Sequence, residues 1–301
     1  RTIGDPRERF GEDHLRLLRA VRLAAQLGFE IESGTWAALV EDAPLVRTVS
    51  NERVRDELLK ILAPDGAVRG LELLRRSGLL GIVLPEVAAL EGVLQPAEYH
   101  PEGDVWTHTL GVVENLPPDA GTELALAALL HDVGKPRAAR ERSGRIGFPG
   151  HQEVGARLAE EICRRLVLSG SQTQRVVDLV GNHMRFHEAP RMRLATLKRL
   201  LALPGIEEHL ALHRADLASG SRPADSWEFC RRRLAELSTE PERLRPPRLV
   251  SGRDLLEMGL RPGRDVGRIL AELEEAHLDE RIATREEALE LARRLVEEVL
   301  A

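Results

Sequence analysis

The chain has 301 residues and a net charge of −6, so it can form more than one packed unit and lacks the strong basic excess of a simple polyanion binder. Aromatic residues make up only 3 %, which argues against an extended base-stacking platform. No window approaches about 18 apolar residues and no signal peptide precedes the first helix, so we expect a soluble cytoplasmic protein that contacts no membrane. The absent initiator Met suggests a fragment.

Cysteine and lysine are both scarce. Cys163 and Cys230 each lie in a helical pattern without a second Cys nearby, which predicts ordinary core residues rather than a disulfide or a thiolate zinc site. Of the 43 basic residues only Lys60, Lys135 and Lys198 are lysines. The many arginines can reflect either a GC-rich genome or the recognition of phosphates, and for most positions we favour the first explanation.

Apolar residues recur at spacings of three and four almost throughout, which predicts an all-α fold with one short hairpin at 141–151. Start signals include Ser50 and the pair Thr284 and Glu287. Proline-rich and glycine-rich stretches divide the chain into segments 1–95, 96–240 and 241–301. The predicted helices are 12–28, 34–43, 51–62, 65–77, 106–115, 121–133, 151–167, 171–185, 193–202, 205–218, 223–237, 251–258, 263–277 and 284–300.

The middle segment carries most of the histidines, and its helix "LALAALL" ends in His131 and Asp132. Gly134 follows and is expected to turn the chain sharply, so that both side chains face one pocket. Burying an imidazole beside a carboxylate is costly without a task, which favours metal binding. A mixed set of imidazoles and carboxylates suits Mn, Fe, Co, Ni or Zn. The further candidate ligands are His108, His151, His183 and Asp216.

Other histidines favour a structural interpretation. A single His on an apolar helix face is more often a satisfied core residue, and we predict this for His187, His209 and His213. Lys135 is either a cation near a bound phosphate or a solvated lysine favoured by the end of the helix.

The order of His108, His131 with Asp132, and Asp216 is similar to the HD superfamily of metal-dependent phosphohydrolases. The resemblance implies that these four residues bind one divalent ion, with His151 and His183 completing a second site or contacting substrate. It also implies hydrolysis of a phosphate ester by a metal-activated water, with His131, Asp132 and Lys135 as the catalytic residues.

At the N-terminal end, Glu12 and Asp13 are expected to begin a helix on which Asp13 and Arg16 share a face, with Arg19 one turn further. A solvated ion pair is one interpretation. The other is base recognition, since a carboxylate beside a guanidinium matches the exocyclic amine and ring nitrogen shared by cytosine and adenine.

The stretch "RTIGDPRERFGEDHLRLLRAVRLAAQLGF" strongly resembles the neck of bacterial tRNA nucleotidyltransferases, the CCA-adding enzymes, and their poly(A) polymerase relatives; Leu23 replaces the usual Phe. The resemblance implies that Asp13, Arg16 and Arg19 read CTP or ATP, and that Arg53 and Glu57 brace this helix. It extends to the tail and implies a helical neck and body, an HD-type bundle and a small helical tail that contacts tRNA.

The family's transfer chemistry needs a head domain that holds Mg through two carboxylates at alternate positions, and no Asp-x-Asp occurs in these 301 residues. We therefore expect a family fragment that binds the tRNA 3′ end, and CTP or ATP only if a head is supplied. Its own chemistry is expected to be hydrolysis of a phosphate or 2′,3′-cyclic phosphate. The alternative is a non-catalytic tRNA-binding scaffold with a structural or empty HD site.

Overall fold

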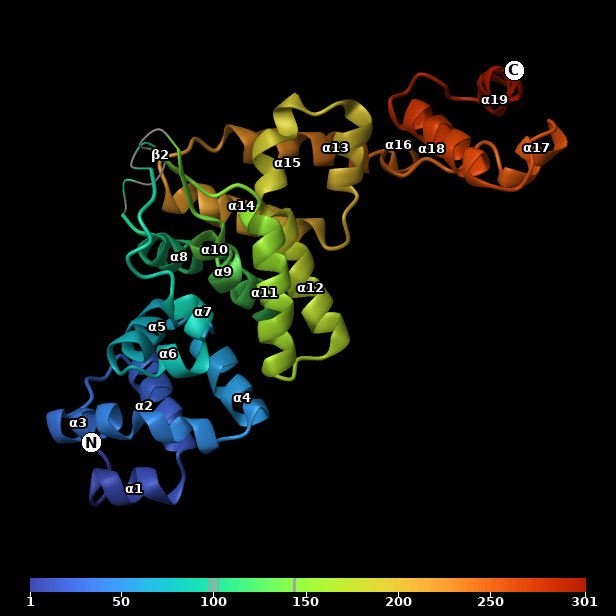
Figure 1. The fold of residues 1–301 in the computed structure, drawn as a ribbon. Helices are drawn as coiled ribbons and strands as arrows, with labels where there is room; N and C mark the ends of the chain where they lie inside the picture. The colour runs from blue at the N-terminus through green and yellow to red at the C-terminus, as the bar shows by residue number, and fades with distance from the viewer. Residues whose placement is uncertain (97, 99–100, 102, 143–144) are drawn as a thin grey trace. The chain divides into compact units, whose positions relative to one another are not determined.

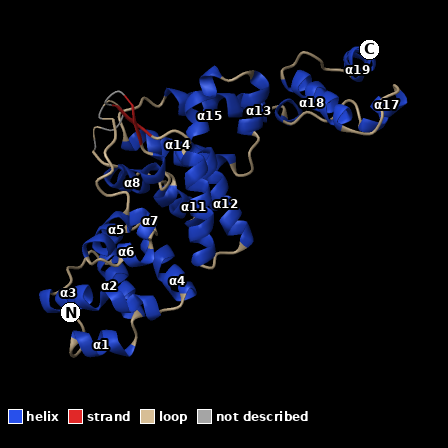
Figure 2. Cartoon of the chain, in the orientation of Figure 1, coloured by secondary structure: helices blue, strands red, loops and turns tan. Residues whose placement is uncertain are grey.

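The computed structural model describes every residue except 97, 99–100, 102 and 143–144 (Figure 1). Its described part is almost entirely helical, with two short strands (Figure 2), which confirms the all-α prediction. The strands β1 (Arg140–Arg142) and β2 (Arg145–Gly147) pair antiparallel where the hairpin was predicted. Residues 143–144, between the two strands, lie outside the described residues.

Two compact units make up the chain. The first contains Arg1–Met184 and Glu207–Ala224, and the second contains Arg185–Ile206 and Asp225–Ala301. Each has its own apolar core. The three segments predicted from the sequence are functional divisions and stay a prediction.

The N-terminal helices correct one expectation, because the predicted helix 12–28 is two helices. Asp13 adopts extended backbone angles and ends the first helix, and its Oδ1 accepts a hydrogen bond from the amide of Leu15, the first residue of the second helix, at 3.1 Å. Glu12 therefore closes a helix instead of opening one. The elements of this part are α1 (Pro6–Glu12), α2 (Leu15–Gln26), α3 (Ser33–Asp42), the 3-10 helix η1 (Ala43–Thr48), α4 (Asn51–Ile61), α5 (Ala67–Arg76), α6 (Leu80–Val83) and α7 (Pro85–Ala88).

Helix α2 is the centre of this part and packs against α4 and α5. Its Leu17, Leu18 and Val21 are almost completely buried, and each contributes about 1.5–3 kcal/mol of burial free energy. Ser50 precedes α4 as predicted, but its side chain makes no capping hydrogen bond.

The histidine-rich elements complete the first unit. Helix α9 is apolar on all sides, and every residue from Leu124 to Leu130 is buried, as expected of a helix enclosed by others. It packs against α8, α11 and α12, and α11 and α12 lie side by side (Figure 1). These elements are α8 (Val105–Glu114), α9 (Thr122–Leu130), α10 (Lys135–Ala138), α11 (His151–Arg165), α12 (Gly170–Asn182), the 3-10 helix η2 (His183–Arg191) that leaves the unit, and α14 (Ile206–Ser219).

The second unit is also helical. Thr284 and Glu287 form the capping box that the sequence predicts, with Glu287 N donating to Thr284 Oγ1 at 3.2 Å. Within the described residues, no helix combines the length and apolar character that crossing a membrane requires. The elements are α13 (Leu194–Leu201), α15 (Asp225–Ser238), α16 (Pro241–Leu244), α17 (Gly252–Glu257), α18 (Arg264–Leu278) and α19 (Arg285–Leu300).

Candidate metal centre

Six predicted ligands converge in the first unit from five helices or helix ends. His131 and Asp132 follow α9, whose last turn delivers them into the interior. His151 begins α11, and His183 follows the end of α12. His108 on α8 and Asp216 on α14 face them, and all but Asp216 are at most 5 % exposed.

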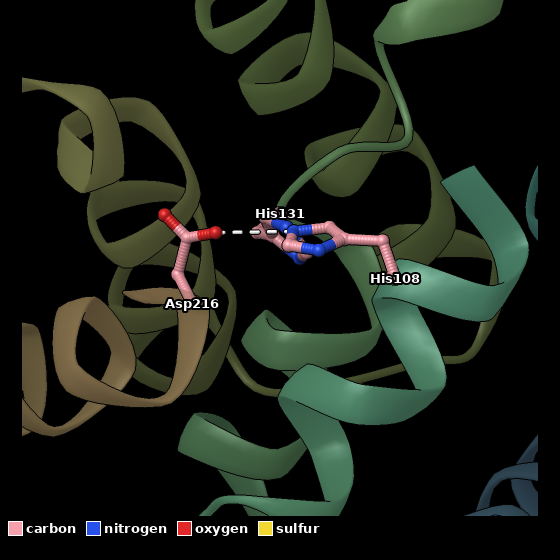
Figure 3. Close-up of side chains that lie close together, drawn as sticks. All are labelled: His108, His131 and Asp216. Carbon is pink, nitrogen blue, oxygen red and sulfur yellow. Dashed lines mark hydrogen bonds and ion pairs between the residues drawn. The ribbon is translucent and has the colours of Figure 1, made fainter. Parts of the chain in front are cut away.

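The ligand atoms form two adjoining groups. His108, His131 and Asp216 offer atoms that lie within 4.8 Å of one another, and His108 Nε2 is 3.0 Å from Asp216 Oδ1 (Figure 3). Asp132, His151 and His183 form the second group with the same spread.

Asp132 lies between the two groups. Its Oδ2 is 3.1 Å from His131 Nε2 and 3.8 Å from His108 Nε2. Its Oδ1 is 3.3 Å from His151 Nε2 and 3.8 Å from His183 Nε2. One carboxylate therefore presents an oxygen to each set of imidazoles, which is the placement a bridging ligand needs.

Three of the histidines are oriented by the same device. The Nδ1 atoms of His131, His151 and His183 each donate to the backbone carbonyl three residues earlier, at 2.8, 2.9 and 2.7 Å. A proton on Nδ1 leaves a lone pair on Nε2, which is the atom that faces Asp132.

Ser219 orients the fourth histidine. Its hydroxyl donates to the His108 carbonyl at 2.8 Å, so its oxygen accepts from His108 Nδ1 at 3.1 Å. A Cβ on Gly111 would lie 2.5 Å from Ser219 Oγ, so glycine makes this approach possible. Ser219 was not predicted from the sequence, although it lies one turn after the predicted ligand Asp216 on α14.

The charges of the site favour an ionised Asp132. Burial opposes ionisation, but the neighbouring imidazole of His131, the ammonium of Lys135 and the imidazole of His151 outweigh it, so the Asp132 pKa lies well below its usual value. Burial, with a smaller contribution from the neighbouring His131, lowers the pKa of His183 to about 3, so this ring is neutral at ordinary pH.

His108 differs from His183. Burial opposes its protonation, yet the hydrogen bond and charge of Asp216 outweigh burial and raise its pKa. A metal bound here would replace the proton between His108 and Asp216, so binding would release a proton.

The residues present fit a divalent metal. His131 Nε2 is buried and has no hydrogen-bond partner among the described residues, an arrangement that is costly unless another group uses the lone pair. The donors are imidazole nitrogens and carboxylate oxygens, which suit a borderline divalent ion.

Lys135 is buried, at 6 % exposure, so the solvated interpretation of this lysine is wrong. Its Nζ lies 2.6 Å from Asp132 Oδ2 and donates to Gln95 Oε1 at 2.6 Å. Gln95 was not predicted, because nothing in its local sequence points to a lysine 40 residues later.

Gly134 lies in a turn, as expected, but the turn is not what requires glycine. Its φ of −79° is open to any residue, so a left-handed turn does not explain it. A Cβ at Gly134 would lie 2.1 Å from the His151 carbonyl oxygen and 2.6 Å from the Gly155 amide nitrogen. Glycine is required because the start of α11, which carries His151, packs directly on this backbone.

A cavity of about 330 Å³ opens onto the ligands. Its lining includes Asp132, His151, His183 and Asp216 together with Lys135. A metal held by these residues would therefore keep open coordination positions that face a space large enough for a small ligand.

The predicted base-reading residues are placed differently from the prediction. Asp13 precedes α2 and does not share a helix face with Arg16, so that expectation is wrong. Asp13 accepts a hydrogen bond from Arg53 at 2.8 Å, whereas Arg16 pairs with Glu12 and donates to the Arg9 carbonyl at 2.8 Å.

Arg19 on α2 is exposed and lines, with Arg9 and Arg16, a cavity of about 410 Å³. Glu57 on α4 is 2 % exposed and accepts from Arg22 Nε at 2.6 Å. Glu57 therefore joins α4 to α2 through Arg22, and Arg53 on α4 binds Asp13 just before α2 begins.

Two family profiles match this chain. One, described as "Probable RNA and SrmB- binding site of polymerase A", matches residues 28–90. The other is the HD domain, which matches residues 105–219 and so contains all six candidate ligands.

Curated relatives match almost the full chain. A CC-adding tRNA nucleotidyltransferase of Thermus thermophilus is 39 % identical and covers 93 % of this chain and 66 % of its own length. An A-adding tRNA nucleotidyltransferase of Deinococcus radiodurans is 36 % identical, with 95 % of this chain and 69 % of the relative covered.

A solved structure agrees with these relatives. The Bacillus stearothermophilus CCA-adding enzyme in complex with CTP matches with a TM-score of 0.66 and 26 % identity. The match covers 99 % of this chain and 66 % of the enzyme's chain. The present chain thus spans about two thirds of the length of the proteins it resembles.

Proposed function

The chain belongs to the tRNA nucleotidyltransferase family, and from that premise we propose that its HD segment is a metal-dependent phosphohydrolase on a tRNA-binding helical body. The substrate is a phosphate or 2′,3′-cyclic phosphate at the end of an RNA or nucleotide. His108, His131, Asp132 and Asp216 bind one divalent ion of the Mn, Ni, Co, Fe or Zn type. His151 and His183 complete a second site with Asp132 or contact substrate.

One observation carries the proposal: four buried imidazoles present Nε2 toward the same two carboxylates while their Nδ1 atoms are occupied elsewhere. His131 is the clearest case, because a satisfied core histidine would use both nitrogens for hydrogen bonds and its Nε2 has no such partner among the described residues. The open cavity supports catalysis over a closed structural site, because a structural metal is enclosed by protein ligands.

Each part of the site would have its own role in phosphate-ester hydrolysis. A bound ion would lower the pKa of a water and offset the charge that develops on phosphorus-bound oxygens. Asp132 stays ionised and can present its oxygens to both groups of histidines. The Lys135 ammonium lies on the cavity wall 2.6 Å from Asp132 Oδ2, where it adds positive charge for an incoming phosphate.

Hydrolysis of a cyclic phosphate to the nucleotide monophosphate, in which water adds to phosphorus and one ribose oxygen leaves, tests this function. The parent protein, His131→Ala and Asp132→Ala are compared on 2′,3′-cyclic AMP with Mn²⁺ or Ni²⁺, with His277→Ala in the second unit as a histidine control. We expect both site variants to lose at least about 100-fold in kcat/KM while the control keeps the parent rate. Equal rates in all four proteins would contradict the proposal.

The N-terminal part is proposed to bind the nucleotide, with Asp13, Arg16 and Arg19 as the selecting residues and CTP or ATP as the ligands when a head domain is present. The tail, residues 241–301, is proposed to contact tRNA. The contacts of Asp13 with Arg53 and of Arg16 with Glu12 support a pre-oriented set.

A non-catalytic tRNA-binding scaffold is the second candidate function. The contact between Lys135 and Asp132 favours it, because an internal ammonium can neutralise this carboxylate without a metal. Gel-shift titration of tRNA against the parent, Asp13→Ala and Arg16→Ala tests the binding. A scaffold binds tRNA and shows no metal-dependent hydrolysis of the cyclic phosphate, whereas a free-standing nucleotidase would be indifferent to both substitutions.

A further inference from the structure

The lining of the metal-centre cavity contains two chemically different groups of residues. The polar group consists of Asp132, His151, His183 and Asp216 with the cations Lys135 and Arg222. The apolar group consists of Pro96, Ile146, Phe148, Pro149 and Met184, and Gly147 completes the lining. A ligand with both a charged part and an apolar part would match this lining.

Phe148 belongs to the apolar group and contacts two residues of the polar group, His151 and Lys135. Its carbonyl accepts the hydrogen bond from His151 Nδ1 at 2.9 Å, so its backbone is fixed relative to a candidate ligand. Its ring lies beneath Lys135 Nζ, which is 5.4 Å from the ring centroid. This contact places a cation suited to a phosphate next to an aromatic surface suited to a planar group.

We propose that Phe148 is the specificity-determining residue of the HD site and that its ring contacts the base of a single nucleotide whose phosphate lies at the metal centre. This inference rests on the proposed phosphohydrolase function. It narrows the substrate to phosphate esters that carry a nucleobase.

The size of the cavity agrees with one nucleotide. Its volume of about 330 Å³ is near the lower end of the range for small-molecule sites, which begins at about 300 Å³. Phe148 is half-buried and belongs to the lining of the cavity. An aromatic pair gains from offset or edge-to-face contact, and a phosphate ester without a base forgoes that gain.

The test compares two secondary phosphate monoesters, adenosine 2′-monophosphate and glycerol 2-phosphate, on the parent protein, Phe148→Leu and Phe148→Tyr. Phe229→Leu is the matched control, since Arg232 lies over the Phe229 ring at 5.8 Å in the second unit, so the same kind of contact is removed elsewhere. With Mn²⁺ present, KM and kcat are measured for each ester. With metal removed, calorimetry gives Kd without turnover.

Phe148→Leu is expected to raise KM and Kd for adenosine 2′-monophosphate about tenfold, in line with the loss of one base–aromatic contact. Values for glycerol 2-phosphate should stay within about twofold, and Phe148→Tyr and Phe229→Leu should resemble the parent. Equal losses on both esters would show that Phe148 only supports His151, and no loss on either would also overturn the proposal.

Failure of the hydrolase function gives a different result. If the parent releases phosphate from neither ester, the proposed function fails, and the metal-free Kd values still decide the role of Phe148. A tenfold weaker Kd in Phe148→Leu supports the aromatic wall. Equal Kd values, or no binding of adenosine 2′-monophosphate by the parent, contradict it.

Discussion

Gly134→Ala should damage the metal centre without changing a single ligand. The added Cβ would lie 2.1 Å from the His151 carbonyl oxygen and 2.6 Å from the Gly155 amide nitrogen, and real Cβ contacts with such atoms are essentially never below about 3 Å. Both atoms belong to the first five residues of α11, so the start of this helix must move by roughly 1 Å to relieve the overlap. His151 is the first residue of α11 and would move with it.

The expected cost has two parts. Overpacking of a well-packed interior costs about 1–3 kcal/mol, and each kcal/mol lowers Tm by about 2–4 °C in a unit of this size. Displacement of an oriented ligand weakens metal affinity by about 10–100-fold, the range seen when supporting contacts of a ligand are lost.

Gly181→Ala is the matched control. Gly181 lies two residues before His183, and a Cβ there would meet only the Ala156 Cβ at 3.6 Å, an ordinary contact. Alanine in a helix is favoured over glycine by up to about 1 kcal/mol, so this variant should be as stable as the parent or more so.

Scanning calorimetry measures Tm without metal, and calorimetric titration with Mn²⁺ measures affinity in all three proteins. Gly134→Ala should lower both Tm and Mn²⁺ affinity, and Gly181→Ala should lower neither. A Gly134→Ala protein with the parent Tm and the parent Mn²⁺ affinity would refute the close-approach explanation of this glycine.

Three further predictions concern other buried groups. Glu57→Ala should lower the free energy of unfolding by about 3 kcal/mol, because Arg22 keeps its charge in a largely buried position without its partner. Urea unfolding measures this loss, and an equal loss when Glu57→Ala is made in an Arg22→Leu background would show that the loss does not come from the ion pair. Burial raises the pKa of Cys163 to about 12 and that of Cys230 to about 11, so both thiols are protonated at pH 8 and should react with a thiol reagent only after unfolding; rapid labelling of the folded protein would contradict this. Lys198→Met should change the free energy of unfolding by less than about 1 kcal/mol, whereas Lys198→Ala should lower it by about 2–3 kcal/mol. The reason is that the partner carboxylate, Glu280, is 42 % exposed, so the packed aliphatic part of Lys198 contributes more than its charge. Equal stability of the two variants in urea unfolding would contradict this.

Much of the molecule follows from local sequence. The spacing of apolar residues predicts the helices because one buried face per helix is required whatever the partner, and α9 is apolar all round because it is enclosed. The contiguous His131 and Asp132, with histidines at 108, 151 and 183 and Asp216, also pointed to the group that the structure brings together, because such residues are rarely buried without a partner.

Other features exist only in three dimensions. At the break between α1 and α2, the Asp13 carboxylate accepts hydrogen bonds from the Leu15 amide and from Arg53 on α4, and the second contact joins residues 40 apart in the chain. Periodicity cannot report it, since the apolar residues on both sides of the break fit one continuous helix equally well.

At the metal centre, the sequence determined which side chains were available and the tertiary structure decided how they act. The bridging position of Asp132, the hydrogen bond from His108 to Ser219 and the burial of Lys135 all depend on distances between separate helices. Gly134 shows the difference most clearly: the letters "HDVGK" predicted a turn and residues 131–134 form one, but with a Gly134 φ that any residue can adopt. Its lack of a side chain matters because α11 packs within reach of its backbone, and only the packed fold sets that distance.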